Sequence, residues 1–268
     1  MPPPDERCSF IGRAHRKERL MWERFDVEEE PRLDDAILLV ALSTMAPQYR
    51  AMYSHARELS KYLLGKMEFR KIATIYSSSL PPAISIADDG IARLNSNGFH
   101  LYEGKRPLVM VAGDGSPFDD QHQYAHSILS FSRGLGVRSM ISVGARWSEA
   151  PIAPGSTPKV VGFSTDTEGV KELEARGVVV TKSEPGPFFP NLIVGMAAGY
   201  GMRGYKLGVD HGEPTPHPRS VIQILRVLQG MGGFEVETKE LEERAEGMKE
   251  EPQGSLPEVP RERGGIYG

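Results

Sequence analysis

Two uninterrupted runs of apolar residues mark the chain. The first is "AILLVALS", Ala36–Ser43, and the second lies in "PLVMVAGD", Pro107–Asp114. Apolar runs of this length without alternation are typical of strands that are buried on both faces. Further strands are predicted in "KIATIYS", "VRSMISVGA", "PKVVGFST", "VVVT" and "YKLGVDHG". Buried strands of this kind need helices on both sides of their sheet.

Between the strands, apolar residues recur at intervals of three and four, which predicts amphipathic helices. In "PQYRAMYSHARELSKYLL" this face comprises Tyr49, Met52, Ala56, Leu59 and Leu63, with Pro47 suited to the first turn. Further helices are predicted in "QYAHSILSFSRGLG", "TEGVKELEARG", "PNLIVGMAAGYG", "PHPRSVIQILRVLQGMGG" and the charged "TKELEERAEGMKEE", and a short helix around Arg16–Arg24. Gly134 and Gly136 are placed to end the first of these helices.

The alternation of strands and helices predicts one α/β domain with a mostly parallel sheet covered on both sides. We place this domain at residues 35–249, after an N-terminal extension of residues 1–34 that is charged and rich in proline. Residues 250–268 read as a flexible polar tail. The segment Ser77–Lys105 lacks a helical pattern and predicts loops and short strands inserted in the sheet.

The composition favours a globular cytoplasmic protein. Charged residues make up 25% of the 268 positions, the net charge is −4, and basic residues are scattered, which argues against a nucleic-acid partner. No segment reaches the roughly 18 apolar residues of a membrane span. The N-terminal "MPPPDERCSF" lacks an apolar signal core, so secretion is not expected. The single cysteine, Cys8, rules out an intrachain disulfide and fits a reducing compartment.

A pair of histidines is the first candidate for chemistry. His122 and His126 are four residues apart in a predicted helix, a spacing at which two histidines can share a zinc ion. Gln123 stands where a zinc protease needs its glutamate base, and a glutamine cannot accept the proton. We therefore expect no metal site, and both histidines on an exposed or subunit-facing surface.

Two turns at predicted strand ends are the other candidates. The turn around Gly113–Ser116 follows a buried strand and precedes a helix, where parallel sheets bind anions, but it lacks the spacing of a nucleotide-binding motif. The turn Asp210–Glu213, with His217 beyond it, could supply acid–base groups. Glycine freedom in the first turn and three prolines in the second are sufficient structural explanations. No catalytic residue and no cofactor are expected.

The order of these motifs resembles the proteasome assembly chaperone 2 family, in particular its archaeal members. The resemblance covers about residues 35–250 and rests on "VMVAGDGSP", "MISVGARW", "PKVVGFSTDTEGVKELEARGV" and "GPFFPNLIVGMAAGYGMRGYKLGVDHGEPTPHPRSVIQILRVLQ". The first strand and turn of such proteins tend to be rich in glycine, whereas this chain has "ALSTMAPQY". That departure weakens any ligand role for this turn.

The resemblance implies a three-layer α/β sandwich similar to purine nucleoside phosphorylases, used as a chaperone or binding scaffold rather than as an enzyme. It also implies self-association into a homo-oligomer, which the small residues around Met196–Tyr200 favour as well. The implied partner is the proteasome core particle, through its alpha subunits.

The C-terminus supports the same partner. Ile266, Tyr267 and Gly268 look like the hydrophobic–tyrosine–any-residue motif with which proteasome activators and assembly chaperones dock on the core particle. A free terminal carboxylate can pair with a lysine in a pocket between subunits, and the tyrosine adds a flat apolar ring. If these residues fold back on their own domain instead, the motif has no docking role.

Two functional hypotheses follow. The first is a proteasome assembly chaperone or an ATP-independent activator, since no P-loop motif occurs in the sequence. The second is an enzyme that acts on a nucleoside or another phosphate-bearing metabolite through the two turns described above. An open pocket with converging polar groups at these turns would favour the enzyme, and a pocket filled by side chains would favour the scaffold.

Overall fold

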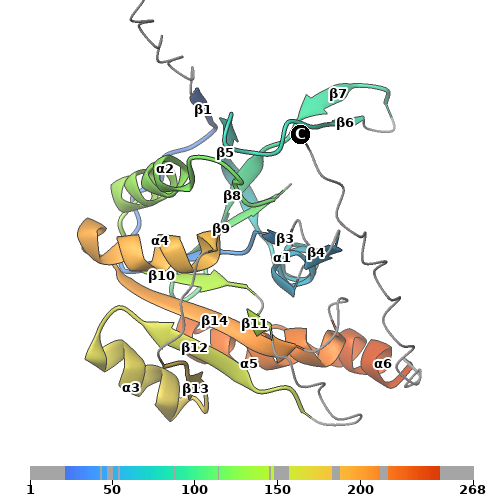
Figure 1. Cartoon of the computed structure of the whole chain (residues 1–268), viewed down its shortest axis with the longest axis vertical. Helices are drawn as coiled ribbons and strands as arrows, with labels where there is room; N and C mark the ends of the chain where they lie inside the picture. Colours follow the sequence, from blue (N-terminus) through green and yellow to red (C-terminus); the bar gives the residue numbers. More distant parts are fainter. Residues whose placement is uncertain are drawn as a thin grey trace, which may run out of the picture.

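One large sheet organises the structure (Figure 1). The computed structural model describes residues 22–42, 44–46, 51–53, 55–86, 89–113, 115–144, 146–147, 157–182, 188–211 and 217–247. The strands of the sheet lie in the order β1-β5-β8-β9-β2-β10-β14-β12-β13, and β11 pairs with β14. Their bounds are β1 Glu23–Val27, β2 Ala36–Val40, β5 Arg70–Ser77, β8 Asn97–Tyr102, β9 Leu108–Gly113, β10 Val137–Val143, β11 Arg146–Trp147, β12 Val160–Ser164, β13 Val179–Val180 and β14 Arg203–His211.

The sheet is mixed, with a parallel centre. Strands β9, β2, β10 and β14 are parallel neighbours, whereas β1, β5 and β8 on one side and β12 on the other pair antiparallel. The prediction of a mostly parallel sheet is therefore right for the centre and wrong for the flanks. Strands β8 and β9 follow each other through a short connection, and a short connection can only join antiparallel neighbours.

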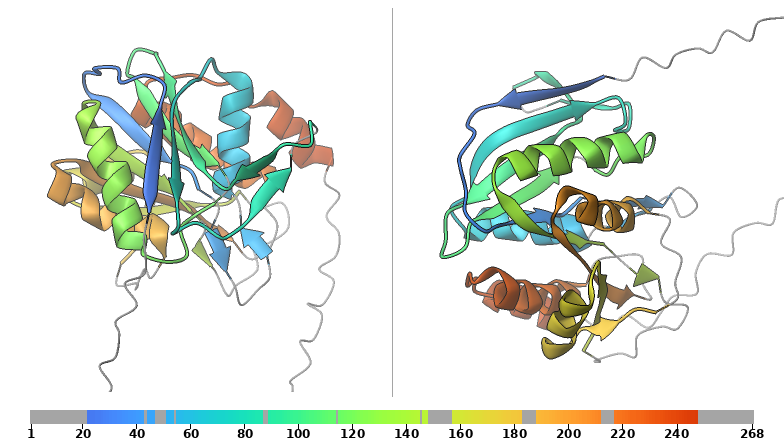
Figure 2. Two further views of the ribbon diagram at one scale, coloured as in Figure 1. Left: turned by 90° about the horizontal axis from the view of Figure 1, so that it is seen from above. Right: turned by 90° about the vertical axis from the view of Figure 1, so that its left-hand side faces the viewer.

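Helices cover both faces of the sheet, as predicted (Figure 2). Along β2, Ile37 and Leu39 belong to a core shared with α1, α5 and α6, whereas Leu38 and Val40 belong to a second core shared with α2 and α4. The apolar run that begins at Ala36 is thus buried on both faces. The helices are α1 His55–Lys66, α2 Gln121–Gly134, α3 Thr167–Ala175, α4 Phe189–Ala197, α5 Pro218–Gly232 and α6 Lys239–Gly247, and the 3-10 turn η2 is Ala198–Tyr200.

The helix predicted to start near Pro47 is wrong over Ala51–Tyr53. The helix α1 begins at His55, and Ala51–Tyr53 instead forms β4, which pairs with β3, Thr44–Ala46. Of the predicted face, Ala56, Leu59 and Leu63 are in the helix and buried, whereas Tyr49, like Pro47, lies outside the described residues. Met52 fits the helical spacing by coincidence. It lies four positions before Ala56, but it belongs to β4 and not to the helix.

The sheet also begins earlier than predicted. Strand β1 lies within the expected extension of residues 1–34 and forms the outer strand next to β5. The short helix expected around Arg16–Arg24 is wrong at its end, because Glu23 and Arg24 are in this strand, and residues before 22 lie outside the described part. Phe25 explains the pairing, since its ring packs on Phe99 and Phe131 at centroid distances of 5.9 and 5.0 Å.

The connection between α2 and β10 depends on one glycine. Helix α2 includes Gly134, so the predicted stop belongs to Gly136, which has a φ of +99°. The backbone N–H of Leu33 donates to the carbonyl of Leu135 at 2.8 Å, so the segment before β2 runs against this turn. A Cβ on Gly136 would lie 2.0 Å from the carbonyl oxygen of Leu33.

A hairpin extends from the sheet in the inserted segment, where short strands were predicted. Strands β6, Ile84–Ile86, and β7, Ala92–Leu94, form a separate two-stranded sheet that extends away from the body of the structure (Figure 1). It is attached through Asn95, whose side chain donates to the carbonyl of Pro81 at 3.1 Å. Among the helices in the described part of the chain, none is both long and apolar enough to cross a membrane.

Candidate functional site

The residues predicted to dock on a partner, Ile266, Tyr267 and Gly268, lie outside the described residues. The last described element is α6, which ends at Gly247. The tail motif therefore stays a prediction from the sequence.

The glycine turn after β9 is closed on its inner side by a side chain. The buried Asn97 amide donates to the carbonyl of Gly115 at 2.9 Å and to the hydroxyl of Tyr124 at 2.7 Å, while its oxygen accepts from Gly115 N at 3.4 Å. A Cβ on Gly113 would lie 2.5 Å from the carbonyl oxygen of Ser96. The glycines thus allow this close packing, and the Gly115 N–H already has a partner. Asp114 lies outside the described residues.

Replacing Asn97 by alanine is expected to destabilise the protein by about 2 kcal/mol, because the buried groups of Gly115 and Tyr124 lose their partner. Replacing Tyr124 by phenylalanine removes only one of these hydrogen bonds and should cost about 1 kcal/mol. Urea denaturation of both variants measures the two free energies. Equal stability of the Asn97→Ala variant and the original protein would show that the amide does not close the turn.

The two histidines lie on the exposed face of α2, as expected. Nδ1 of His126 and the hydroxyl of Tyr200 are hydrogen-bonded, and the two rings are 5.8 Å apart. His126 therefore connects α2 to the turn that follows α4. Among the described residues, no group of three or more metal-binding side chains occurs.

The second predicted turn lies at the end of β14. Asp210 and His211 are opposite Arg146 and Trp147 of β11 in the strand register, and Glu213 lies outside the described residues. His217 caps α5, because its Nδ1 accepts from the backbone N–H of Arg219 at 3.1 Å. The structure thus gives His217 a local structural role at the start of a helix.

A buried lysine near this edge of the sheet was not predicted from the sequence. Lys206 of β14 is only 6% exposed, and its Nζ donates to the carbonyls of Gly144 at 3.0 Å and Leu207 at 2.8 Å. Burial lowers the pKa of Lys206 to about 7. The pattern of "YKLGVDHG" does not indicate whether its lysine side chain is buried or points to solvent.

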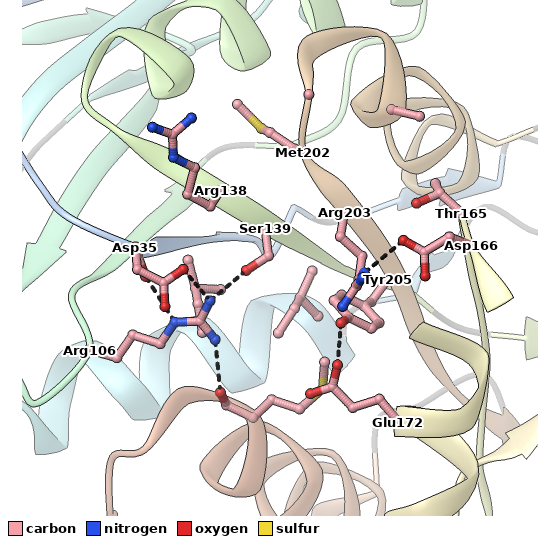
Figure 3. Close-up of a pocket in the computed structure, with 15 residues that line it drawn as sticks. Asp35, Arg106, Arg138, Ser139, Thr165, Asp166, Glu172, Met202, Arg203 and Tyr205 are labelled. Carbon is pink, nitrogen blue, oxygen red and sulfur yellow. Dashed lines mark hydrogen bonds and ion pairs between the residues drawn. The ribbon is translucent and has the colours of Figure 1, made fainter. Parts of the chain in front are cut away.

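A cavity of about 580 Å³ lies at the opposite edge of the sheet, near the amino ends of β2, β10 and β14 (Figure 3). One wall is formed around Arg106, which donates to the carbonyl of Asp35 at 2.9 Å, the carboxylate of Asp35 at 3.0 Å and the hydroxyl of Ser139 at 3.1 Å. It also reaches the carbonyl of Met231 at 3.4 Å. Arg106 thus joins the starts of two strands to the end of α5.

The facing wall is a second network (Figure 3). Nε of Arg203 donates to Asp166 at 2.7 Å, and the other oxygen of Asp166 accepts from Gly169 N at 2.7 Å, which caps α3. The hydroxyl of Tyr205 donates to Glu172. Burial, together with this hydrogen bond, raises the pKa of Tyr205 to about 12, whereas the Gly169 N–H and then Arg203 lower the pKa of Asp166.

The charges in this cavity are largely paired with one another. Arg106 and Arg203 each contact a carboxylate, and Glu172 contacts Arg176 at 3.2 Å. The Arg203–Asp166 pair joins the start of α3 to β14, and Arg106 and Arg176 also donate to the carbonyls of Met231 and Gly230 in α5, so this geometry accounts for a structural role. Sequence reasoning missed them because Asp35, Arg106, Asp166 and Arg203 are far apart in the chain and form no local motif.

Comparison with known families identifies the chain. A model of the PAC2 family matches residues 56–254, well over half of the sequence. The chain belongs to the PAC2 family. The family resemblance predicted from the sequence is therefore confirmed, whereas the likeness to purine nucleoside phosphorylases stays a prediction. A search of curated protein sequences gives no match.

Solved structures share the PAC2 fold. PbaB of Pyrococcus furiosus, an archaeal proteasome activator, is 20% identical with a TM-score of 0.71, over 84% of this chain and 95% of its own. PbaA of the same organism, an archaeal homologue of proteasome-assembly chaperone, is 20% identical with a TM-score of 0.66, over 84% and 92%. A proteasome-assembly chaperone homologue of Mycobacterium tuberculosis is 17% identical with a TM-score of 0.64, over 79% and 91%. At these identities the likeness establishes the fold.

Proposed function

We propose that this PAC2 protein docks on the alpha subunits of the proteasome core particle through Ile266, Tyr267 and Gly268, as an assembly chaperone or an ATP-independent activator. The observation that carries the proposal is that the family of the domain and the sequence of the tail indicate the same partner. The family model matches residues 56–254, and the docking-type ending lies outside that span. PbaB, which is described as a proteasome activator, has the same fold.

The length of the tail suits this role. Residues 250–265 number 16. As a flexible coil they have a reach of about 20–24 Å, and fully extended they span roughly 50–58 Å at most. Either length is enough for Ile266 and Tyr267 to reach a partner beyond the domain surface. Gly264 and Gly265 allow the last residues to turn into a pocket without steric cost.

We also propose that the protein acts in the cytoplasm as a homo-oligomer. A single three-residue contact is weak, whereas several tails on one assembly bind together, because each binding event raises the effective concentration of the remaining tails. Light scattering at micromolar concentration tests this point, since a monomer has a mass of 29.6 kDa.

Adding one residue after Gly268 is expected to abolish binding to the proteasome core, because it moves the terminal carboxylate and keeps every side chain. Deleting Ile266–Gly268 and replacing Tyr267 by alanine should abolish binding as well. The change Leu256→Ala, in the same tail but outside the motif, is the matched control and should bind like the original protein. A pull-down of purified core particle measures all four variants.

Two results would contradict the proposal. If the extended protein binds the core as well as the original protein does, the terminal carboxylate is not captured. If deletion of the last three residues lowers the melting temperature by several degrees, the tail packs on its own domain.

A further inference from the structure

A second cavity, of about 710 Å³, lies between helix α5 and the last two strands of the sheet, β12 and β13. Three of the residues that line it are basic, Lys159, Arg176 and Arg226, and among the described lining residues none is acidic. It is called the basic cavity here. The whole chain carries a net charge of −4, so this concentration of positive charge differs in sign from the protein around it.

The three basic side chains differ in their pairing. Arg176 is held in place, because its guanidinium donates to the carbonyls of Glu172 and Gly230 at 3.1 Å each and pairs with the Glu172 carboxylate at 3.2 Å. Lys159 and Arg226 are exposed and form no ion pair or side-chain hydrogen bond with any residue in the described part of the chain. Two uncompensated cations beside one concave surface attract an anionic ligand.

The rest of the lining is apolar and borders a free edge of the sheet. Val179 of β13 is 47% exposed, and Val160 and Val227 also line the cavity. Strand β13 is last in the strand order, so one of its edges has no neighbouring strand among the described residues. Such an edge presents main-chain N–H and C=O groups, and extended peptides bind by pairing with them.

The direction of the nearby helices favours a peptide over a phosphate group. Helix α3 ends at Ala175, and Gly177 of its last turn lines the cavity, so the helix presents its partly negative carbonyl end there. Helix α5 begins at Pro218, eight positions before Arg226, so its N–H groups lie about two turns away. A compact phosphate lacks the N–H cradle on which it usually binds, whereas a peptide brings N–H donors as well as carboxylates.

We infer that the basic cavity binds an acidic, partly apolar segment of a partner protein in an extended conformation. Carboxylates of this segment pair with Lys159 and Arg226, and an apolar side chain between them packs on Val179. This site lies in the folded domain and does not involve the chain terminus. It therefore adds a second contact surface to the proposed docking through the tail.

The first test reverses single charges. The probe is a short fluorescein-labelled peptide of alternating glutamate and valine, and fluorescence anisotropy measures its binding. The original protein should bind the peptide, and the affinity should fall as salt is added. Arg226→Glu and Lys159→Glu should each weaken binding at least tenfold, because an attraction becomes a repulsion. Both residues are exposed, so the melting temperatures of the variants should stay close to that of the original protein.

A matched control lies on the other side of the sheet. Arg133 of α2 is exposed and has no ion pair among the described residues, and α2 packs in the core on the opposite face from α5. Arg133→Glu changes the net charge by the same two units and should bind the peptide like the original protein. An equal loss in Arg133→Glu and Arg226→Glu, or an original protein that does not bind the peptide, would overturn the inference.

Three further measurements test the nature of the ligand. The same peptide with glutamine in place of glutamate should bind at least tenfold more weakly, and equal binding would exclude recognition by charge. Inorganic phosphate at millimolar concentration should not displace the peptide, and complete displacement would assign the cavity to a small anion. Deletion of residues 250–268, which include Glu250 and Glu251, should leave the affinity unchanged. A tenfold gain would assign the cavity to the acidic tail of the chain itself and overturn the inference of a partner.

Discussion

Replacing Lys206 by methionine is expected to remove a pH dependence of stability that the original protein shows between pH 7 and pH 10. The folded protein holds this amine with a pKa of about 7 because it is buried, whereas an unfolded lysine has a pKa of about 10.4. Between these values the unfolded chain binds a proton that the folded chain does not. Stability therefore rises with pH in this window, and below pH 7 the contribution is constant.

The size of the effect follows from the pKa difference. Each pKa unit corresponds to about 1.4 kcal/mol, so the original protein should gain about 3 kcal/mol over the variant from pH 7 to pH 10. The variant also leaves the carbonyl of Gly144 without the hydrogen bond from Nζ. Guanidinium denaturation of both proteins at several pH values measures the difference.

An exposed lysine provides the control. Among the described residues, Lys171 of α3 pairs with Glu168 alone, at 2.8 Å, and both side chains are largely exposed. The change Lys171→Met should therefore alter stability by the same small amount at pH 7 and pH 10. If the Lys206→Met variant behaves in this way too, the amine is not held neutral in the folded protein.

Replacing Gly136 by alanine is expected to destabilise the protein by about 3 kcal/mol or more. Its φ of +99° is unfavourable for any residue with a Cβ. The added atom would also lie 2.0 Å from the main-chain oxygen of Leu33, which cannot move without disturbing the entry into β2. Thermal and urea unfolding measure the loss.

The matched control lies two residues earlier. Gly134 is in the last turn of α2, and a Cβ there would meet no atom within 4 Å. Gly134→Ala should therefore stabilise the protein by about 0.5–1 kcal/mol, because alanine is the better helix former. Equal effects of the two substitutions would contradict the assigned roles of these glycines.

Most layers of this fold could be predicted from the sequence, because a strand buried on two faces is continuously apolar and a helix on its surface repeats apolar residues at intervals of three and four. Ala36–Val40 is continuously apolar, and α5 repeats its apolar residues at helical intervals. It did not predict the direction of the flanking strands, since "KIATIYS" has the same pattern whether its neighbour is parallel or antiparallel. The prediction of a helix from Pro47 onwards is wrong because Ala51–Tyr53 forms β4.

The functional surfaces were predicted less completely. The docking residues remain a prediction, based on three consecutive residues, Ile266, Tyr267 and Gly268, that resemble a complete motif. The cavity of Arg106 and Arg203 depends on residues that only the fold brings together. The exposed apolar side chains of β6 and β7 come from "ISI" and "ARL", and short apolar stretches in a loop region do not reveal whether they are buried.

The position of β2 in the sheet has a consequence for biosynthesis. This apolar strand is made early, but its two neighbours are β9 and β10, and β9 begins about seventy residues later. At the usual rate of about 5–20 residues per second, the nascent chain carries an unpaired apolar strand for roughly 4–14 s before its first neighbour is synthesised. During this interval the growing chain itself exposes an apolar strand that is prone to aggregation.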